Sequence, residues 1–372
     1  MKTLFFTAFL FFAATIVKAE PLISGLQGSG SEQDPVLIGT ADDLRVLSAI
    51  IMNGPMGNNS TKDAYFKMTD DIVFDTNSLI YDFDEDGTNE SNFIPIGGRS
   101  GIRTASDWHN FQGIFDGDGH VISGLRILYG NVNYVGLFGQ SYGGSIYRVG
   151  IEDGIFSGNG SVASLCGLAT GAEYGFPGTT IKECFARDVD VTGNYWAVGG
   201  LIGATYTDAI VENCYVGGGY VDGIDFVGGF CGNNNGNAII KNSYFFGYVE
   251  SRSGTLGNYG GFAGQAKTDT ANNHAILNVI NCYYNDDWKI SDSVLTADFA
   301  LAGSPKNISF MFRGVFVDSL NLGQTAIWQT NCKGDGTPSL YWECEQVVAN
   351  EADYKVEDGL KVYPNPVTDG VL

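Results

Sequence analysis

The amino-acid sequence predicts an all-β protein, a right-handed parallel β-helix (solenoid) with a short N-terminal helix. Three observations predict this fold. Glycine accounts for 52 of the 372 residues but keeps no three-residue period, which argues against collagen. A short glycine-bounded pattern returns five times in the middle of the chain. Further short runs of β-branched and aromatic residues follow its copies, as expected for strands.

The five copies of the glycine pattern lie at residues 135–139, 163–167, 198–203, 227–232 and 259–264. A second run follows each copy, at residues 146–149, 181–184, 211–214, 240–243 and 279–282, and a third is visible at 189–191, 220–221 and 248–249. One unit of three short strands cannot bury its apolar face, but stacked units can, so the repeat indicates a solenoid. A β-propeller would need about 40 residues and four strands per blade.

The chain divides by composition into six segments. Residues 1–19 have a basic start at Lys2, an apolar run and small or apolar residues before the expected cleavage site, which predicts a secretory signal peptide. The segments are 1–19 signal peptide, 20–110 N-terminal cap and first rungs, 111–290 repeat β-helix, 291–344 C-terminal end of the solenoid, 345–358 acidic linker, and 359–372 start of a further domain.

The repeats resemble those of the GLUG-repeat proteins. Gly200-Leu-Ile-Gly203 followed by Asn213-Cys-Tyr215 matches their signature, although Ala163-Ser164 and Ser243 depart from it in other copies. Further matching segments lie at 34–44, 93–97, 111–122 and 338–342. In the first of these, Thr40 is the expected N-cap of a helix, with Asp43 as its capping-box partner. The resemblance implies a secreted, adhesin-like β-helix.

The C-terminal sequence Tyr363-Pro-Asn-Pro366 resembles the opening of the C-terminal sorting domain of the type IX secretion system of Bacteroidetes-type bacteria. This resemblance implies export through the periplasm to the cell surface or medium, with the type IX machinery as a partner. The sorting domain would be truncated at Leu372.

The charge of the chain excludes some partners. Its formal charge is −22, which repels nucleic acids and anionic membranes. After the signal peptide, no stretch approaches the roughly 18 apolar residues of a membrane helix. We therefore expect no nucleic-acid partner and no membrane insertion, and we expect a monomer.

The sequence offers no catalytic motif. The three histidines, His109, His120 and His274, form no zinc-protease pattern, and we expect a structural role for His120. Four carboxylates in comparable third-strand regions could line a sugar-cleaving surface, although the sequence cannot pair them. They are Asp188, Asp190, Asp222 and Glu250.

We therefore expect a secreted or surface-displayed binding or adhesion protein, with a glycan or a cell surface as its ligand, and no enzymatic activity. Tyrosine has a flat apolar face and a polar tip, so exposed tyrosines on the rungs are the expected contact groups. These are Tyr142, Tyr195, Tyr206, Tyr220 and Tyr248. Two alternatives stay open: a polysaccharide lyase or glycoside hydrolase on the same scaffold, and a stalk without a ligand.

An acidic loop predicts a structural Ca²⁺ site. Its expected ligands are Asp82, Asp84, Asp86, Thr88 and Glu90, while Glu85 points away. Alternating oxygen ligands at this spacing suit Ca²⁺, as in an EF-hand loop. However, Phe93 stands where that loop has its bidentate glutamate, and a solvated acidic turn is the alternative.

The seven cysteines divide into two groups. Cys184, Cys214 and Cys282 share one repeat position with Ser243, and Cys166 and Cys231 share another. Free cysteine is a small, readily buried side chain, so both columns are expected to be buried. Cys166 and Cys231 lie two rungs apart, at about twice the 4.8 Å strand spacing, which is too far for a disulfide. Cys332 and Cys344 flank a turn outside the repeats and are the expected disulfide.

Overall fold

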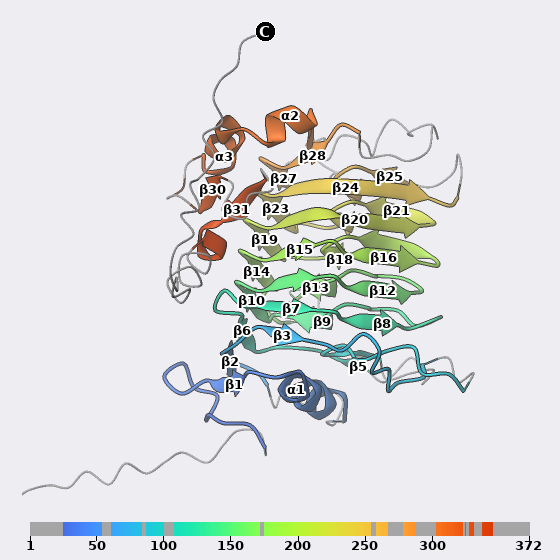
Figure 1. The fold of residues 1–372 in the computed structure, drawn as a ribbon, viewed down its shortest axis with the longest axis vertical. Coiled ribbons are helices and arrows are strands. Elements are labelled where there is room, and N and C mark those ends of the chain that lie inside the picture. Colours follow the sequence, from blue (N-terminus) through green and yellow to red (C-terminus); the bar gives the residue numbers. More distant parts are fainter. Residues whose placement is uncertain are drawn as a thin grey trace, which may run out of the picture.

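The computed structural model describes residues 25–53, 61–83, 87–99, 108–171, 175–253, 258–266, 278–287, 303–322, 324, 327–330 and 337–344. In this part of the chain, successive turns of short parallel strands stack along one axis (Figure 1). The predicted all-β parallel β-helix is confirmed. The predicted signal peptide, acidic linker and sorting-domain start lie outside the described residues.

Three parallel sheets run the length of the stack, because each strand pairs with its counterpart one rung along. The first sheet contains, in spatial order, β1 (Val36–Ile38), β2 (Tyr65–Met68), β6 (Ile114–Asp116), β10 (Ser145–Tyr147), β14 (Thr180–Lys182), β19 (Ile210–Glu212), β23 (Ile239–Lys241) and β27 (Val279–Ile280).

The second sheet contains β3 (Ile72–Val73), β7 (Val121–Ser123), β11 (Gly150–Glu152), β15 (Phe185–Arg187), β20 (Tyr215–Gly223), β24 (Tyr244–Ser251), β28 (Tyr283–Asn285) and β29 (Ser304–Lys306). Three more strands pair beside them, β8 (Arg126–Leu128), β12 (Ile155–Gly158) and β16 (Asp190–Gly193). The long strands β20 and β24 span both parts of this sheet.

The third sheet contains β9 (Phe138–Tyr142), β13 (Cys166–Thr170), β18 (Ile202–Thr205), β22 (Cys231–Asn234) and β26 (Ala263–Ala266). A narrow sheet precedes it on the later rungs, with β17 (Trp196–Gly199), β21 (Asp225–Gly228) and β25 (Tyr259–Gly260). Two antiparallel pairs complete the strands, β4 (Gly98–Arg99) with β5 (Trp108–His109) and β30 (Trp328–Thr330) with β31 (Pro338–Leu340).

The core lies inside the coil and is built from columns of like residues. Ile146, Ile181, Val211 and Ile240 occupy equivalent positions on consecutive strands of the first sheet, and each is at most 1 % exposed. Neighbouring strands lie about 4.8 Å apart, so each side chain covers the one before it. Each rung thereby buries the apolar face that it could not bury alone.

The turn between the first two sheets explains the asparagines of the repeat. Glu183, Asn213, Asn242 and Asn281 have φ between +50° and +55°, in the left-handed region. Asparagine enters this region more readily than most residues, because its short polar side chain can hydrogen-bond locally. The repeat therefore places asparagine where the chain must change direction.

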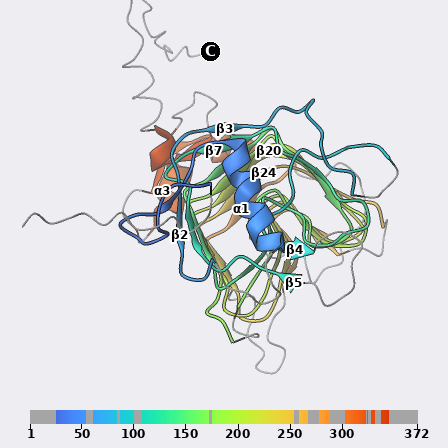
Figure 2. The ribbon, with the colours of Figure 1, turned by 90° about the horizontal axis from the view of Figure 1, so that it is seen from below.

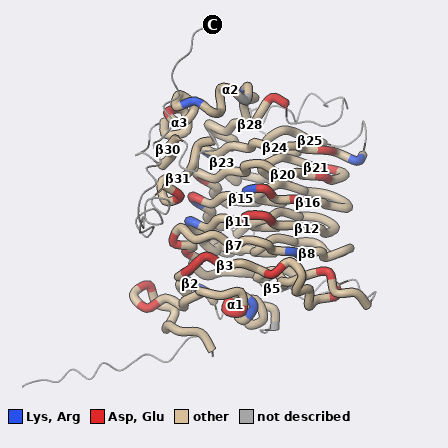
Figure 3. Tube along the Cα trace, viewed as in Figure 1, with Lys and Arg blue, Asp and Glu red and all other residues tan. Residues whose placement is uncertain are grey.

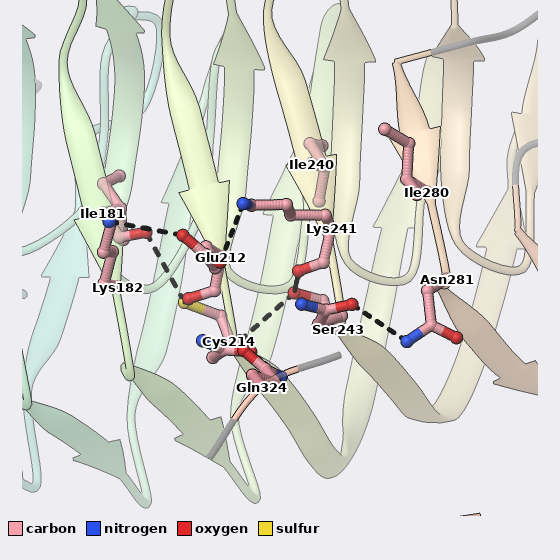
Figure 4. A network of polar contacts seen from close by, with 12 residues as sticks. Ile181, Lys182, Glu212, Cys214, Ile240, Lys241, Ser243, Ile280, Asn281 and Gln324 are labelled. Atoms are coloured by element: carbon pink, nitrogen blue, oxygen red, sulfur yellow. Dashed lines mark hydrogen bonds and ion pairs between the residues drawn. The ribbon is translucent and has the colours of Figure 1, made fainter. Parts of the chain in front are cut away.

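The predicted cysteine column follows this turn and is buried (Figure 4). The Cys214 thiol donates to the carbonyl oxygens of Glu212 at 3.3 Å and Ile181 at 3.9 Å. One rung later the Ser243 hydroxyl donates to the Lys241 carbonyl at 2.9 Å and accepts from the Cys214 amide at 3.1 Å. The Ser243 hydroxyl and the Cys214 thiol thus each donate to the carbonyl two residues before them, at equivalent positions on successive rungs.

Helix α1 (Ala41–Asn53) lies across the first end of the coil (Figure 2). The expected capping box is present: the Asp43 amide donates to Thr40 Oγ1 at 3.2 Å, and the Thr40 amide donates to Asp43 Oδ2 at 2.9 Å. Leu44 and Leu47 are fully buried in the core below the helix. The helix therefore covers apolar side chains that would otherwise end the stack in water.

The described residues from 303 onward first extend the stack and then fold back along its side. Strand β29 adds one strand to the second sheet. Helix α2 (Ile308–Met311) then lies over the last strands of the stack, and α3 (Gly314–Leu320), β30 and β31 lie along one side of the coil (Figure 1). We call the described residues 308–344 the clasp.

The clasp covers an outward aromatic ladder on the second sheet. Phe185, Tyr215 and Tyr244 stack at 5.0 Å between successive ring centroids. Trp342 stacks on Phe185 at 5.4 Å, and Trp328 contacts both tyrosines. Most of residues 291–344 that the structure describes therefore flank the solenoid, and only β29 continues it.

Candidate functional site

An open groove of approximately 410 Å³ lies outside the third sheet, on the later rungs. Its volume is within the range of about 300–1,000 Å³ that is usual for small-ligand sites. The lining combines aromatic and amide side chains: Tyr195, Trp196, Tyr206, Asp225, Phe226, Asn233, Asn235 and Gln265.

The floor of the groove is part of one column of the third sheet. Each member directly follows the last glycine of a repeat copy, and the five members are in register. They are Gln140, Leu168, Ala204, Asn233 and Gln265. Leu168 and Ala204 belong to an apolar cluster outside the main core, which shows that this column faces outward. Asn233 and Gln265 bring amides to the floor on adjacent rungs.

One rim of the groove is formed where β17 and β21 lead into the third sheet. Ala197 and Phe226 both have left-handed φ, of +60° and +53°, at equivalent positions just before the paired valines of these strands. Trp196 lies over Gly160 of the preceding rung, where a Cβ would be 2.9 Å from the indole Nε1. A glycine at position 160 is therefore required to seat the tryptophan.

Tyr206 and Asn235 line the opposite rim, after β18 and β22 respectively. The Asn233 side-chain amide donates to the Tyr206 hydroxyl at 3.4 Å, so the rim and the floor are connected. Tyr195 is 59 % exposed. An exposed ring thus stands beside a buried polar floor.

Asn233 is only 3 % exposed, and no described group donates a hydrogen bond to its Oδ1. Asp225, in contrast, is well satisfied, because its Oδ1 accepts from the Phe226 amide and from the Asn258 amide and side chain, at 2.8–3.0 Å. The residues that line the groove thus include an acceptor with no donor in the described part of the chain and a carboxylate that is held in place.

The groove is closed toward the earlier rungs by the outer apolar cluster. Tyr134 and Tyr142 pack there with Leu168 and Ala204, and the Tyr142 ring lies 6.4 Å from that of Phe176. Tyr142 is 3 % exposed, so the prediction that it is an exposed contact group is wrong. It fails because outward strand positions can be covered by neighbouring turns.

The other predicted tyrosines fall on two surfaces. Tyr195 and Tyr206 line the groove. Tyr220 and Tyr248 lie on the second sheet, in register with one another, and Tyr248 is 51 % exposed. Sequence reasoning missed Trp196 and the floor amides, although the position after each final glycine was visible in the repeat.

Three of the four predicted carboxylates lie on the second sheet, among acidic residues spread along the stack (Figure 3). Asp222 and Glu250 are neighbours in register. Burial raises the pKa of Asp222, and the nearby Arg252, at 2.8 Å from its Oδ2, opposes this shift. Glu250 accepts a hydrogen bond from the Tyr220 hydroxyl.

Asp190 belongs to the same sheet, in register with Tyr220, and is exposed. Asp188 lies at the preceding corner with φ +51°, and its amide donates to the Gly217 carbonyl at 3.1 Å. None of the four predicted carboxylates lines the groove.

The predicted calcium loop is described only in part. Asp82 Oδ2 accepts from the Gly87 amide at 2.8 Å, while Asp84, Glu85 and Asp86 lie outside the described residues. Thr88 and Glu90 follow on the described strand-like segment, whose Glu90 amide donates to the Tyr81 carbonyl at 3.0 Å. In the described residues no three His, Cys, Asp or Glu are grouped to hold a metal. The Ca²⁺ site stays a prediction.

The cysteines follow the expected division. Cys166, Cys184, Cys214, Cys231 and Cys282 are free and buried. Ile202 lies between Cys166 and Cys231 in register, as predicted, and burial raises the pKa of both thiols to about 12. Cys344 is disulfide-bonded, and its predicted partner Cys332 lies outside the described residues.

His120 has a structural role, as expected. Its Nδ1 lies 3.1 Å from Asp71 Oδ1, which also accepts from the Val121 amide at 2.9 Å. The contact links the starts of β3 and β7. His109 ends β5, and His274 lies outside the described residues. No helix in the described part of the chain is long and apolar enough to cross a membrane.

A known sequence motif matches part of the repeat region. Residues 194–219, which include three groove residues, match the GLUG motif. The chain is similar to Halomucin from Haloquadratum walsbyi, with 31 % identity over 185 residues, or 50 % of this chain. The chain spans about 2 % of Halomucin's own length.

The fold was also compared with solved structures. A crystal structure from Bacteroides ovatus, described as a candidate immunoglobulin A1 protease, is similar with a TM-score of 0.49 and 17 % identity. The match covers 86 % of this chain and 96 % of that protein.

Proposed function

We propose that this protein is a surface-displayed GLUG-motif β-helix that binds glycans in the groove beside β22. One observation carries the proposal: Asn233 lines the groove, and its buried Oδ1 is an acceptor that no described group satisfies. A buried polar atom without a partner costs about 1–3 kcal/mol, so a ligand hydroxyl that donates to it would be favourable.

The chemistry of the lining supports a sugar as the ligand. A sugar ring has C–H groups on its faces and hydroxyls around its edge. Trp196 and Tyr206 offer flat apolar surfaces with a polar edge, and Gln265 adds an amide that can both donate and accept. The aromatic rims suit the C–H faces of a sugar ring, and the amide floor suits its hydroxyls.

The GLUG motif and the likeness to Halomucin support a secreted or surface location. The signal-peptide pattern at 1–19 supports export, and Tyr363-Pro-Asn-Pro366 supports the type IX route through the periplasm. We therefore also propose that the protein is exported by this route.

A glycan array tests the proposal, with the wild-type protein compared with Trp196→Ala. Tyr248→Ala is the matched control, because it removes an exposed aromatic ring from another sheet. We expect wild type and Tyr248→Ala to bind the same glycans and Trp196→Ala to lose them. Equal binding by all three proteins would overturn the groove as the site.

Product assays on every array hit separate the remaining alternatives. New reducing ends or unsaturated products would indicate a glycoside hydrolase or a polysaccharide lyase. Absence of any hit would favour the stalk without a ligand.

A further inference from the structure

The charge of the groove restricts which glycans it can take. Among the described residues that line it, one is a carboxylate, Asp225, and none is a lysine or arginine. Three N–H donors already hold the Asp225 carboxylate in place. A sugar carrying a carboxylate or sulfate would meet this negative charge, with no cation among the described lining residues to pair with.

The direction of the groove follows from the register of the sheets. Trp196 precedes Asp225 by one rung, Ala204 precedes Asn233, and Asn233 precedes Gln265. The lining therefore covers three consecutive rungs, about 10 Å along the axis at a strand spacing of about 4.8 Å. Equivalent lining residues recur along the solenoid axis, whereas the two rims limit the width of the groove perpendicular to that axis.

Toward the earlier rungs, the floor changes from amide to apolar. Leu168 and Ala204 contribute no hydrogen-bonding side chain, and Tyr134 and Tyr142 pack over them. The polar part of the floor thus begins at Asn233, so the hydrogen bonds that the floor offers come from the Asn233 and Gln265 rungs.

From these observations we propose that the groove binds an uncharged oligosaccharide of about two to three units, lying along the solenoid axis across three rungs, which are about two strand spacings apart from first to last. A hydroxyl of this ligand donates to Asn233 Oδ1. The inference rests on the proposed function and names its ligand class.

Calorimetric titration tests the charge of the ligand. Cellotriose, xylotriose and triacetylchitotriose are the uncharged probes, trigalacturonic acid is the acidic probe and the chitosan trimer is the cationic one. We expect at least one uncharged trisaccharide to bind at least tenfold more tightly than the acidic one. Tighter binding of a charged probe, lost in Trp196→Ala, would overturn the inference while leaving the groove as a glycan site. No binding of any probe at millimolar concentration would overturn both.

The length and the floor contact are tested with the uncharged sugar that binds best. Its affinity should rise at least tenfold from the monosaccharide to the trisaccharide, and equal affinity would contradict an axial chain. Asn233→Ala should lose at least tenfold in affinity, and Gln265→Ala should reduce it as an independent floor variant. Tyr248→Ala should bind like the wild type. Unchanged binding by both floor variants, with unchanged melting temperatures, would contradict the contact.

Discussion

The guanidinium of Arg187 lies 2.8 Å from the carboxylate of Glu343, which follows it by 156 residues. Glu343 is 1 % exposed, and its Oε2 also accepts from the Tyr215 hydroxyl at 2.8 Å. Arg187 lies 4.8 Å from the centre of the Phe185 ring and 2.7 Å from Glu152. The pair therefore joins the clasp to the aromatic ladder of the solenoid.

Removing one partner of this pair should loosen the clasp. Among the described residues, Glu343→Ala leaves the largely buried Arg187 with Glu152 as its counter-charge, and losing one partner of a buried pair costs about 3–5 kcal/mol. We expect a loss near the lower end of that range, measured by urea unfolding. The double variant Arg187→Met/Glu343→Leu is the control and should regain most of the loss. A single variant as stable as the wild type would show that the clasp does not depend on this pair.

The cysteine column predicts a contrast between two substitutions at one position. Cys214→Asp places a carboxylate in a fully buried site without a cation, and should destabilise the protein by several kcal/mol. Cys214→Ser should cost much less, because Ser243 occupies the equivalent position one rung later and donates to the equivalent carbonyl, that of Lys241. Thermal unfolding of both variants checks this. Equal melting temperatures for Cys214→Asp and wild type would place the column in solvent.

Glu212 predicts a pH-dependent contribution to stability. Burial alone would raise its pKa, but the hydrogen bonds from Lys241 and Lys182 outweigh burial and lower it (Figure 4). A lowered folded-state pKa gives stability that is present above the unfolded value of 4.5 and lost as the pH falls below it. Both lysines are partly exposed, so the effect at pH 7 is less than about 1 kcal/mol.

Glu212→Gln should therefore be less stable than wild type at pH 7, and the difference should be smaller at pH 3. Urea unfolding at the two pH values measures the difference. A stability loss that is the same at both values would assign the effect to packing rather than to charge.

The acidic loop should bind Ca²⁺ when EDTA-stripped protein is titrated in a calorimeter. Binding to the folded state alone adds about 1.4 kcal/mol when Ca²⁺ is near ten times Kd. Asp84→Ala should abolish the heat, whereas Asp190→Ala, an exposed carboxylate on the second sheet, should leave it unchanged. No heat and no rise in melting temperature at 10 mM Ca²⁺, roughly tenfold above a millimolar Kd, would leave only a solvated acidic turn.

The fold was predictable because its information is local and repeated. The Asn213 turn, the Cys214 column and the Thr40 cap each follow from residue chemistry at one position of the repeat or helix. The clasp was not predictable in this way. Glu343 contacts Arg187 because a non-repeating segment packs against the solenoid. No periodic pattern in residues 308–344 predicts which face of the solenoid this segment covers.

The groove was predictable only in part. Tyr195 and Tyr206 were expected as contacts from residue type, but Tyr142 has the same type and is buried under Phe176. Whether such a tyrosine is exposed depends on which turns cover its strand. Turn length varies between rungs, so residue type alone does not predict it. The floor amides required knowing that the residue after each final glycine faces outward.

A crystal structure of the protein grown with its best-binding uncharged trisaccharide tests the central claim most directly. We predict sugar rings along the axis in the groove, one ring against Trp196 or Phe226, and a hydroxyl within hydrogen-bond distance of Asn233 Oδ1. A sugar seated instead over Tyr220 and Tyr248, with the groove empty, would contradict the account.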